Sequence, residues 1–394
     1  MMSILRQALT VVGTGCLTLS AWATQHLVSP GDDWSRLAPR LKPGDEIVLM
    51  PGRHIAAYFE DLHGASDKPI IIRPLSRDHP VLIGAREQGL HLVRPRHVII
   101  RDIQVVGASG NGINMDDGGI DPDKTPDAQP WPANVRLERV SVLRTGPVGN
   151  HDGIKISGLS GVYLIECIVE GWGGSAVDLV GCKDVTIERC EFRGLLDFSQ
   201  DNGVQAKGGS TDITILECIF RDAGKRAINA GGSTGLRFFR PPVPVDAAPG
   251  SRFEAERITI ERCLFVGGDC AVAFVGARGV TVHACTVVNP RMWAFRILQE
   301  TDDSRFGPCQ RGVLTSNLVV WNQETIRQPW NIGPGVDAGS FVLESNLWWG
   351  GEGQRRLELP GRVGSDEVTD LNPLLDEKFR PQAPGARGYG RPGE

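Results

Sequence analysis

Lys207 and Arg226 are the residues of this sequence best suited to chemistry. Lys207 ends the alternating stretch NGVQAK at 202–207, and Arg226 opens the similar stretch RAINA one repeat later. A lysine becomes a general base when nearby cations or burial lower its pKa, whereas an arginine stays charged and binds a carboxylate through two hydrogen bonds. The pair favours β-elimination on a uronate-containing polysaccharide, with Lys207 as the base and Arg226 as the carboxylate clamp. His151, which precedes Asp152, is an alternative base.

A short pattern of small, apolar, polar and apolar residues supplies further polar side chains. It reads GINM at 112–115, GIKI at 153–156 and AVDL at 176–179, and it recurs up to residue 297. Such alternation is typical of a strand with one buried face, so we expect the polar position to point outward. The outward residues, and polar residues just before the pattern, are the candidate substrate-binding residues: Asn114, Asp152, Lys155, Asp178, Asn202, Gln205, Asn229 and Arg296.

A longer pattern lies between these stretches and indicates how they are positioned. It reads apolar, x, apolar, x, x, Cys or Asn, x, apolar, and its nine copies run from VIIRDIQV at 98–105 to FVLESNLW at 341–348, with 22 to 45 residues from one copy to the next. Two or three short strands in a repeat of this length indicate a parallel β-solenoid. A propeller is disfavoured, because each blade needs four strands.

The sixth position of the long pattern holds cysteine in five consecutive copies. Equivalent residues of successive coils stack about 4.8 Å apart, and parallel side chains at that spacing are slightly too far apart for good disulfide geometry. We therefore expect mostly buried free thiols at these positions: Cys167, Cys190, Cys218, Cys263 and Cys285.

Three long insertions interrupt the repeats, at 116–133, 232–256 and 298–311. Each follows a copy of the short pattern and precedes a copy of the long one, so we expect all three to leave the solenoid along one edge. Loops gathered on one edge of a rigid scaffold commonly wall a binding site. The outward column beside them is therefore the expected substrate face.

The chain is expected to form one domain after an export signal. Residues 1–23 contain one basic residue, an apolar run and a final Ala-Trp-Ala, which is typical of a cleaved signal peptide. We expect the β-solenoid at 24–375, with a helical cap at 32–41 opened by an Asp, and a C-terminal tail at 376–394. The predicted location is extracellular or periplasmic.

Charge and hydropathy narrow the choice of partners. The net charge is −5, and it becomes −6 (−5 − 1) when Arg6 leaves with the signal peptide. No block of basic residues is present, which argues against a nucleic-acid partner. No stretch after the signal is long and apolar enough to span a membrane. We expect a monomer whose partner is a polysaccharide.

The signal peptide, the opening LKPGDEIVLMPGRH at 41–54 and the nine long patterns resemble right-handed parallel β-helix proteins of the pectate-lyase-like superfamily. The resemblance covers nearly the whole mature chain. It implies an all-β, single-stranded right-handed parallel β-helix of about nine to eleven coils with an N-terminal helical cap. It does not choose a reaction, because the superfamily contains lyases, hydrolases, epimerases and adhesins.

The stretch AKGGSTDITILECIF at 206–220 resembles the region of the catalytic lysine in chondroitinase B and alginate lyases. This resemblance implies a polysaccharide lyase in which Lys207 is the catalytic lysine. The arginine of those lyases would fall on Asn229, whereas Arg226 stands three residues earlier. Among the acidic residues that bind calcium in those lyases, only Asp201 has a counterpart here. Calcium is therefore a candidate cofactor, and the metal stays open.

Two other functions stay open as well. A glycoside hydrolase needs two carboxyl groups about 5–9.5 Å apart, which Asp152, Asp178 and Asp201 could supply. The stretch NHDGIKISG at 150–158 resembles the NTDG region of polygalacturonases, but glycines at 173–174 replace the Asp pair that those enzymes carry in the next coil. A non-catalytic polysaccharide-binding or cell-surface β-helix would share the same fold and the same face.

Overall fold

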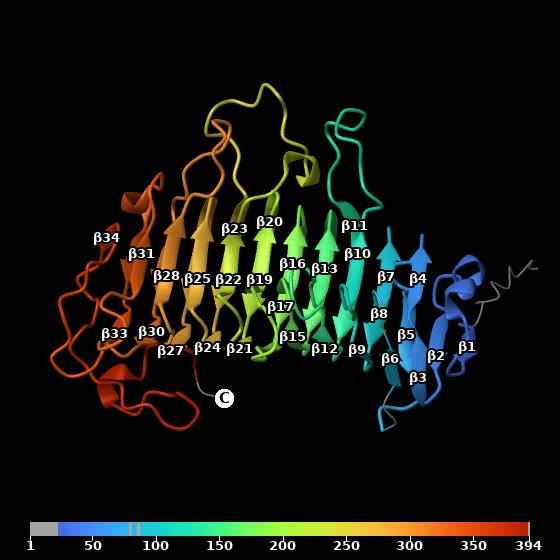
Figure 1. Cartoon of the computed structure of the whole chain (residues 1–394), viewed down its shortest axis with the longest axis horizontal. Coiled ribbons are helices and arrows are strands. Elements are labelled where there is room, and N and C mark those ends of the chain that lie inside the picture. The colour runs from blue at the N-terminus through green and yellow to red at the C-terminus, as the bar shows by residue number, and fades with distance from the viewer. Residues whose placement is uncertain (1–22, 79–80, 85–86, 393–394) are drawn as a thin grey trace, which may run out of the picture.

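The computed structural model describes residues 23–78, 81–84 and 87–392 of the chain. Over these residues the chain winds through three parallel sheets that stack into a β-helix (Figure 1), as the sequence predicted. Sheets A, B and C contain 13, 11 and 10 strands, respectively. Within the described part, no helix is long and apolar enough to cross a membrane. The predicted signal peptide lies almost wholly outside the described residues.

Sheet A contains, in order along the axis, β1 (Gln25–Val28), β2 (Glu46–Leu49), β5 (Ile70–Pro74), β8 (Val98–Arg101), β11 (Trp131–Glu138), β14 (Leu159–Ile165), β17 (Lys183–Glu188), β20 (Ser210–Leu216), β23 (Ala255–Glu261), β26 (Ala277–His283), β29 (Val313–Thr315), β32 (Val342–Glu344) and β34 (Arg362–Val363). Sheet B contains β3 (Gly52–Ile55), β6 (Val81–Gly84), β9 (Gln104–Val106), β12 (Ser141–Thr145), β15 (Ile168–Trp172), β18 (Glu191–Arg193), β21 (Ile219–Arg221), β24 (Leu264–Val266), β27 (Thr286–Val288), β30 (Leu318–Val320) and β33 (Leu347–Trp349). Sheet C contains β4 (Ala57–Glu60), β7 (Leu90–Val93), β10 (Ile113–Asp116), β13 (Ile154–Ser157), β16 (Ser175–Val180), β19 (Asn202–Lys207), β22 (Arg226–Gly231), β25 (Cys270–Val275), β28 (Trp293–Leu298) and β31 (Trp330–Ile332). Four short 3₁₀ helices are η1 (Trp34–Arg40), η2 (Leu236–Phe238), η3 (Ala338–Ser340) and η4 (Pro384–Ala386).

The long sequence pattern covers two strands and the corner between them. Its first half forms a strand of sheet A and its second half a strand of sheet B, and one residue with positive φ turns the corner: φ is 58° at Asp102, 52° at Arg139 and 55° at Glu166. From Asp102 to Arg262, over six successive coils, the corner residues alternate in charge. Neighbours form ion pairs, such as Arg139 with Asp102 at 2.7 Å and Arg262 with Glu217 at 3.0 Å. The short pattern forms the strands of sheet C.

The cysteine column lies inside the coil, as predicted. Every cysteine of the described residues is buried and free of disulfide bonds. Asparagines continue the column: Asn317 Oδ1 accepts the backbone N–H of Cys285 at 2.9 Å, and Asn346 Oδ1 accepts that of Asn317 at 2.9 Å. On another inner column, the rings of Phe220 and Phe265 stack with centroids 4.8 Å apart. The core is therefore built from columns of similar side chains that repeat at the coil spacing.

The N-terminal cap is present but differs in detail from the prediction. η1 lies at the N-terminal end of the β-helix, where Trp34 is buried. Asp33 makes no side-chain cap, so the predicted Asp cap is wrong; its carboxylate accepts a hydrogen bond from Arg36 Nε at 2.8 Å instead. The C-terminal residues fold back onto sheet B, where the backbone N–H of Arg391 donates to Thr286 Oγ1 at 2.8 Å.

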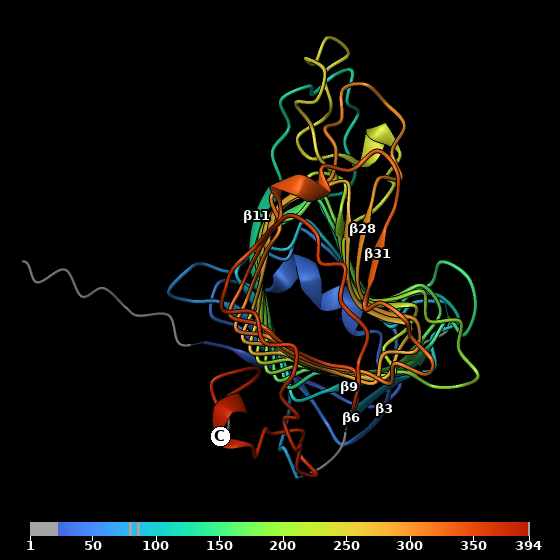
Figure 2. The ribbon, with the colours of Figure 1, turned by 90° about the vertical axis from the view of Figure 1, so that its left-hand side faces the viewer.

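The three insertions leave from one corner, as predicted, because each connects sheet C to sheet A. Figure 1 shows them along one edge of the sheets, and Figure 2 shows them at the same corner when the molecule is viewed along its axis. They also contact one another. Arg240 Nε of the second insertion donates to Asp117 Oδ2 of the first at 2.7 Å, with side chains 6% and 7% exposed, and Arg252 pairs with Phe306 of the third in a β-bridge. The insertions form one connected wall.

Candidate functional site

The outward column of sheet C is in register, as the short pattern predicted. Lys155, Asp178, Gln205 and Asn229 are successive Cα partners on β13, β16, β19 and β22. Adjacent strands are about 4.8 Å apart, so these side chains form one line across the coils. The full line contains Tyr58, His91, Asn114, Lys155, Asp178, Gln205, Asn229, Ala273, Arg296 and Asn331.

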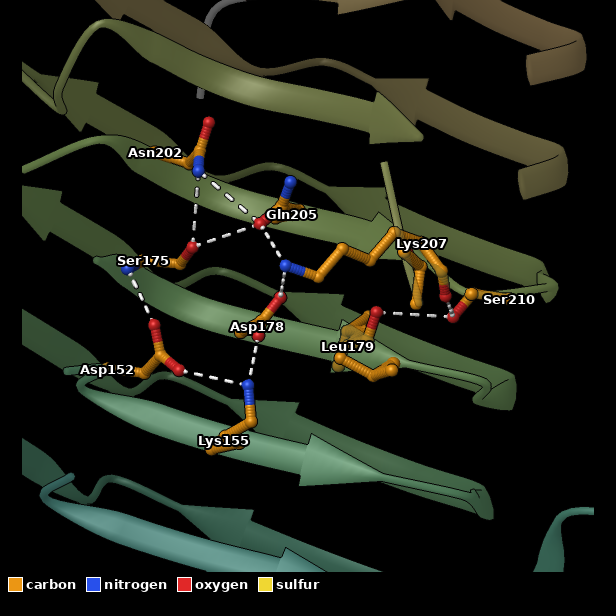
Figure 3. Close-up of polar contacts among 12 residues, drawn as sticks. Asp152, Lys155, Ser175, Asp178, Leu179, Asn202, Gln205, Lys207 and Ser210 are labelled. Carbon is orange, nitrogen blue, oxygen red and sulfur yellow. Dashed lines mark hydrogen bonds and ion pairs between the residues drawn. The ribbon is translucent and has the colours of Figure 1, made fainter. Parts of the chain in front are cut away.

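The centre of the line is a buried ion cluster (Figure 3). Lys155 Nζ donates to Asp152 Oδ2 at 3.2 Å and also to Asp178 Oδ2. Asp152 Oδ1 accepts the backbone N–H of Ser175 at 2.8 Å. Both carboxylate side chains are 1% exposed, whereas the Lys155 side chain is 23% exposed. Lys155 therefore lies between the carboxylates and the solvent.

This cluster shifts the pKa values of two of its members. Burial raises the pKa of Asp152, and the negative charge of Asp178 adds to that effect. Burial alone would lower the pKa of Lys155, but the charges of Asp178 and Asp152 outweigh it and raise that pKa above its ordinary value. Lys155 is thus charged at neutral pH and is no candidate for a base.

Lys207 lies at the end of β19, two residues beyond Gln205. Its Nζ donates to Gln205 Oε1 at 2.9 Å and lies 3.4 Å from Asp178 Oδ1, a buried oxygen that has no hydrogen bond among the described residues. The Lys207 carbonyl accepts Ser210 Oγ at 2.7 Å and the N–H of Gly181 at 2.9 Å. With its side chain 18% exposed, Lys207 is held firmly yet remains in contact with solvent.

The turn after Lys207 is tied to the insertions through one buried carboxylate. Glu254 Oε2 accepts the backbone N–H of Gly208 at 3.1 Å. Glu254 Oε1 accepts the N–H of Thr234, in the second insertion, and Thr301 Oγ1, in the third, each at 2.9 Å. The wall therefore fixes the backbone next to Lys207.

Arg226 contacts the line of side chains and the wall together. Its Nη1 donates to Asn229 Oδ1 at 3.1 Å, and its Nη2 donates to Glu300 Oε1, in the third insertion, at 2.6 Å. The Arg226 side chain is 19% exposed. The Glu300 carboxylate thus occupies one side of the Arg226 guanidinium, and part of the guanidinium surface stays open to solvent.

Asp178, Gln205 and Asn229 were expected to be exposed, and that expectation is wrong. They are 0%, 8% and 2% exposed. The reason is the close spacing of the coils, which lets the longer side chains of Lys207 and Arg226 lie over their neighbours.

Asn202 joins the same network from the start of β19 (Figure 3). Its Nδ2 donates to Ser175 Oγ at 3.3 Å and to Gln205 Oε1 at 3.4 Å. Asn202 therefore helps to orient the amide oxygen that Lys207 also contacts.

Arg296 lies two strands beyond Asn229, with Ala273 between them in the line. Its guanidinium stacks on Trp293 at 4.3 Å from the ring centroid, and its Nε donates to Asn331 Oδ1 at 2.9 Å. Burial and the charge of Arg226 lower the pKa of Arg296 from its usual value. Two guanidinium groups thus share this part of the face.

His151 and Asp201 lie apart from the cluster. His151 is exposed on the turn before β13, and the Asp152 carboxylate faces Ser175 and Lys155 instead. Asp201 Oδ1 accepts Lys225 Nζ at 2.5 Å. The structure therefore brings Asp152 and Asp178 together, but not Asp201.

The residues around Asp201 do not fit a calcium site. Its carboxylate is paired with Lys225, and the amide of Asn202 points to Ser175 and Gln205. Across the described ranges, no group of three or more His, Cys, Asp or Glu side chains could hold a metal ion. Calcium requires six to eight oxygen ligands, usually with several carboxylates.

The sequence reasoning missed Tyr58, His91 and Asp116. The stretches AAYF at 56–59 and GLHL at 89–92 fit the short pattern and could have extended the column by two strands. In the structure, His91 Nε2 and Asp116 Oδ2 are 2.7 Å apart on the outer face.

Comparisons with known proteins agree with this architecture. A family model described as a right handed beta helix region matches residues 152–310. A search of curated proteins gave no significant match. Among solved structures, the chain is similar to the pectate lyase Pel9A, with 12% identity, a TM-score of 0.50 and coverage of 82% of this chain and 80% of the other.

Two further solved structures resemble the chain to the same degree. One is a rhamnogalacturonan lyase, with 11% identity, a TM-score of 0.50 and coverage of 93% and 99%. The other is the A-module of the mannuronan C-5 epimerase AlgE4 of Azotobacter vinelandii, with 12% identity, a TM-score of 0.50 and coverage of 88% and 89%. In fold, this chain is a right-handed parallel β-helix, the architecture that it shares with these solved structures.

Proposed function

We propose that this protein is an exported carbohydrate-active protein that binds an acidic polysaccharide along the outer face of sheet C and cleaves it by β-elimination. The observation that carries the proposal is the layering of charge at the site. The cations Lys155, Lys207 and Arg226 are 18–23% exposed, whereas the carboxylates Asp152 and Asp178 are 1% exposed. A polyanion that lies over Lys155 and Lys207 therefore meets their positive charges before the carboxylates of Asp152 and Asp178.

The elimination step assigns a role to each cation. Lys207, as the free amine, takes the proton from the carbon next to the uronate carboxylate. The electrons of that C–H bond form a carbon–carbon double bond, the glycosidic C–O bond at the neighbouring carbon breaks, and the departing oxygen takes up a proton. Arg226 binds the uronate carboxylate and stabilises the negative charge that develops on it.

The environment of Lys207 bears on this step. Asp178 Oδ1 lies 3.4 Å from Lys207 Nζ. Lys155 pairs with the same carboxylate and offsets much of its charge. Arg226, on the neighbouring strand β22, adds a second positive charge to this face.

Glycoside hydrolysis is the second candidate, and one observation favours it. Asp152 and Asp178 both bond to the Nζ of Lys155, so the two carboxyl groups lie close together. The raised pKa of Asp152 suits a general acid. Substrate would reach them only after displacing Lys155, because both side chains are 1% exposed.

The test is to incubate the mature protein with a panel of uronate polymers and to follow the ultraviolet absorbance of the new double bond conjugated to the carboxylate. Absorbance that rises together with new reducing ends supports the lyase. Reducing ends without absorbance contradict it and favour the hydrolase. Binding with neither signal favours a non-catalytic polysaccharide-binding protein, and the absence of any binding rejects the whole proposal.

A further inference from the structure

The N-terminal end of sheet C carries a second group of polar and aromatic side chains. Tyr58 and His91 are Cα partners on β4 and β7 and continue the outward line beyond Asn114. Their rings meet edge to face, with centroids 5.1 Å apart. Neither residue belongs to the cluster around Lys207, which lies four strands from β7, about 19 Å away.

Asp116 fixes the orientation of His91. Asp116 Oδ2 lies 2.7 Å from His91 Nε2 and accepts Asn114 Nδ2 at 2.8 Å, while Oδ1 accepts the N–H of Gly118 at 2.9 Å. Burial alone would raise the pKa of Asp116, but these hydrogen bonds and the interaction with His91 outweigh it and lower that pKa. Asp116 is therefore an ionised acceptor, and His91 carries its proton on Nε2.

This assignment leaves Nδ1 of His91 as an unprotonated acceptor in the neutral ring. Nδ1 makes no hydrogen bond within the described part of the chain and is not among its buried unsatisfied atoms. The His91 side chain is 24% exposed. The ring thus offers a fixed acceptor to a hydroxyl group arriving from solvent.

Tyr58 adds an aromatic surface beside that acceptor. It is 48% exposed, and its ring lies at nearly a right angle, 88°, to that of His91. Its backbone N–H donates to Ser35 Oγ, in η1, at 3.0 Å, so the N-terminal cap fixes its position. An exposed aromatic ring next to a fixed acceptor has the elements that recognise a pyranose ring, whose one side is apolar and whose rim carries hydroxyl groups.

We infer that Tyr58, His91 and Asp116 form a distal sugar-binding subsite, in which Tyr58 stacks on a pyranose ring and His91 Nδ1 accepts one of its hydroxyl groups. Asp116 is a positioning residue that holds the His91 ring. The ligand class rests on the proposed function. Because β4 lies five strands from β19, about 24 Å away, this subsite binds a sugar several units from the cleaved bond and makes the protein prefer long chains.

The experiment compares a uronate trimer with an octamer, using calorimetry on the Lys207→Ala protein so that the ligand is not cleaved. The octamer can extend from β19 to β4, and the trimer cannot. Tyr58→Ala and His91→Phe should each weaken octamer binding roughly three- to tenfold, the range of one aromatic or hydrogen-bonded contact, and leave trimer binding unchanged. The control is Tyr163→Ala, an outward tyrosine on sheet A.

The possible outcomes separate this inference from the proposed function. Equal octamer affinity in the Tyr58→Ala and parent proteins overturns the subsite and leaves the proposed function standing. Equal affinity of the parent protein for trimer and octamer also overturns the subsite and leaves the proposed function standing. If no uronate oligomer binds at all, both fail. A shift of the His91 ring signals in NMR on adding octamer, but not trimer, supports the subsite directly.

Discussion

Lys207 and Arg226 start at opposite ends of two paired strands, and their side chains donate hydrogen bonds to residues that are neighbours across those strands. The Cα of Arg226 pairs with Asn202 at the start of β19, whereas Lys207 ends that strand. The two cations nevertheless donate to Gln205 and Asn229, which are Cα partners. The site is therefore assembled by long side chains that run along the strands.

Replacing Lys207 with alanine should remove most turnover, by about 10²–10⁴-fold, because general-base catalysis supplies a factor of that size. The fold should persist, since the Lys207 backbone is held independently of its side chain. Initial rates of double-bond formation and a thermal melt test both points. Lys183→Ala, which removes an exposed lysine of sheet A, is the matched control. Full activity in the Lys207→Ala variant would show that Lys207 is not the base and would leave Asp152 and Asp178 as the candidate catalytic residues.

Arg226→Ala should weaken substrate binding and rate by roughly tenfold or more, because a hydrogen-bonded charge contributes about 1.5–3 kcal/mol. Arg226→Lys should rescue poorly, since lysine lacks the planar fork. Glu300→Gln discriminates between the roles of this arginine. If Arg226 binds a carboxylate, losing its competitor Glu300 should lower KM. If Arg226 only anchors the third insertion, the same change should loosen the wall and raise KM.

Stability at alkaline pH should depend on Lys155. Its pKa is raised in the folded protein because Asp178 and Asp152 outweigh burial. The stabilisation is complete below the ordinary lysine pKa of about 10.4 and is lost as pH rises through the higher folded value. Denaturant unfolding should therefore show little change from pH 8 to about pH 10 and a falling stability as pH rises above the ordinary lysine value. Lys155→Met should flatten the decline and should cost up to about 3–5 kcal/mol at neutral pH, because two buried carboxylates lose their partner.

The ion pair of Asp117 with Arg240 should couple the first two insertions. Each alanine variant alone should destabilise the protein by about 3–5 kcal/mol, because it leaves a buried charge without its partner. The double variant should cost clearly less than the sum. A double-mutant cycle in urea measures this coupling, with the exposed pair of Asp33 and Arg36 as the control, for which about 0–1 kcal/mol is expected. Additive effects at Asp117 and Arg240 would show that the insertions are not coupled through this pair.

The outward line was predictable for two reasons. The repeat determines which residues occupy equivalent positions in successive coils, and the alternation determines which face of the strand they occupy. Lys155, Asp178 and Gln205 were placed correctly on both counts. Exposure was not predictable in the same way. Whether Asp178 is open to solvent depends on how the side chains of Lys155 and Lys207 lie over it, and no repeat encodes that.

The partner of Arg226 could not be read from the sequence either. Glu300 belongs to an insertion that has no counterpart in other coils, and it reaches Arg226 across 74 residues of chain. The same holds for Glu254, whose hydrogen-bond donors come from three separate segments. Tyr58 and His91, by contrast, carried the short pattern and were within reach of sequence reasoning.

The alternating charges at the corner between sheets A and B favour the correct order of coils, because opposite charges meet when each coil packs on its proper neighbour. Over six successive coils the corner residues are Asp102, Arg139, Glu166, Arg189, Glu217 and Arg262. If one of these coils were skipped or deleted, two like charges would meet, for example Arg139 and Arg189. Removing two adjacent coils would restore opposite neighbours. Variation in the length of this β-helix should therefore be tolerated in steps of two coils, and pairing errors of a single coil should be rejected during folding.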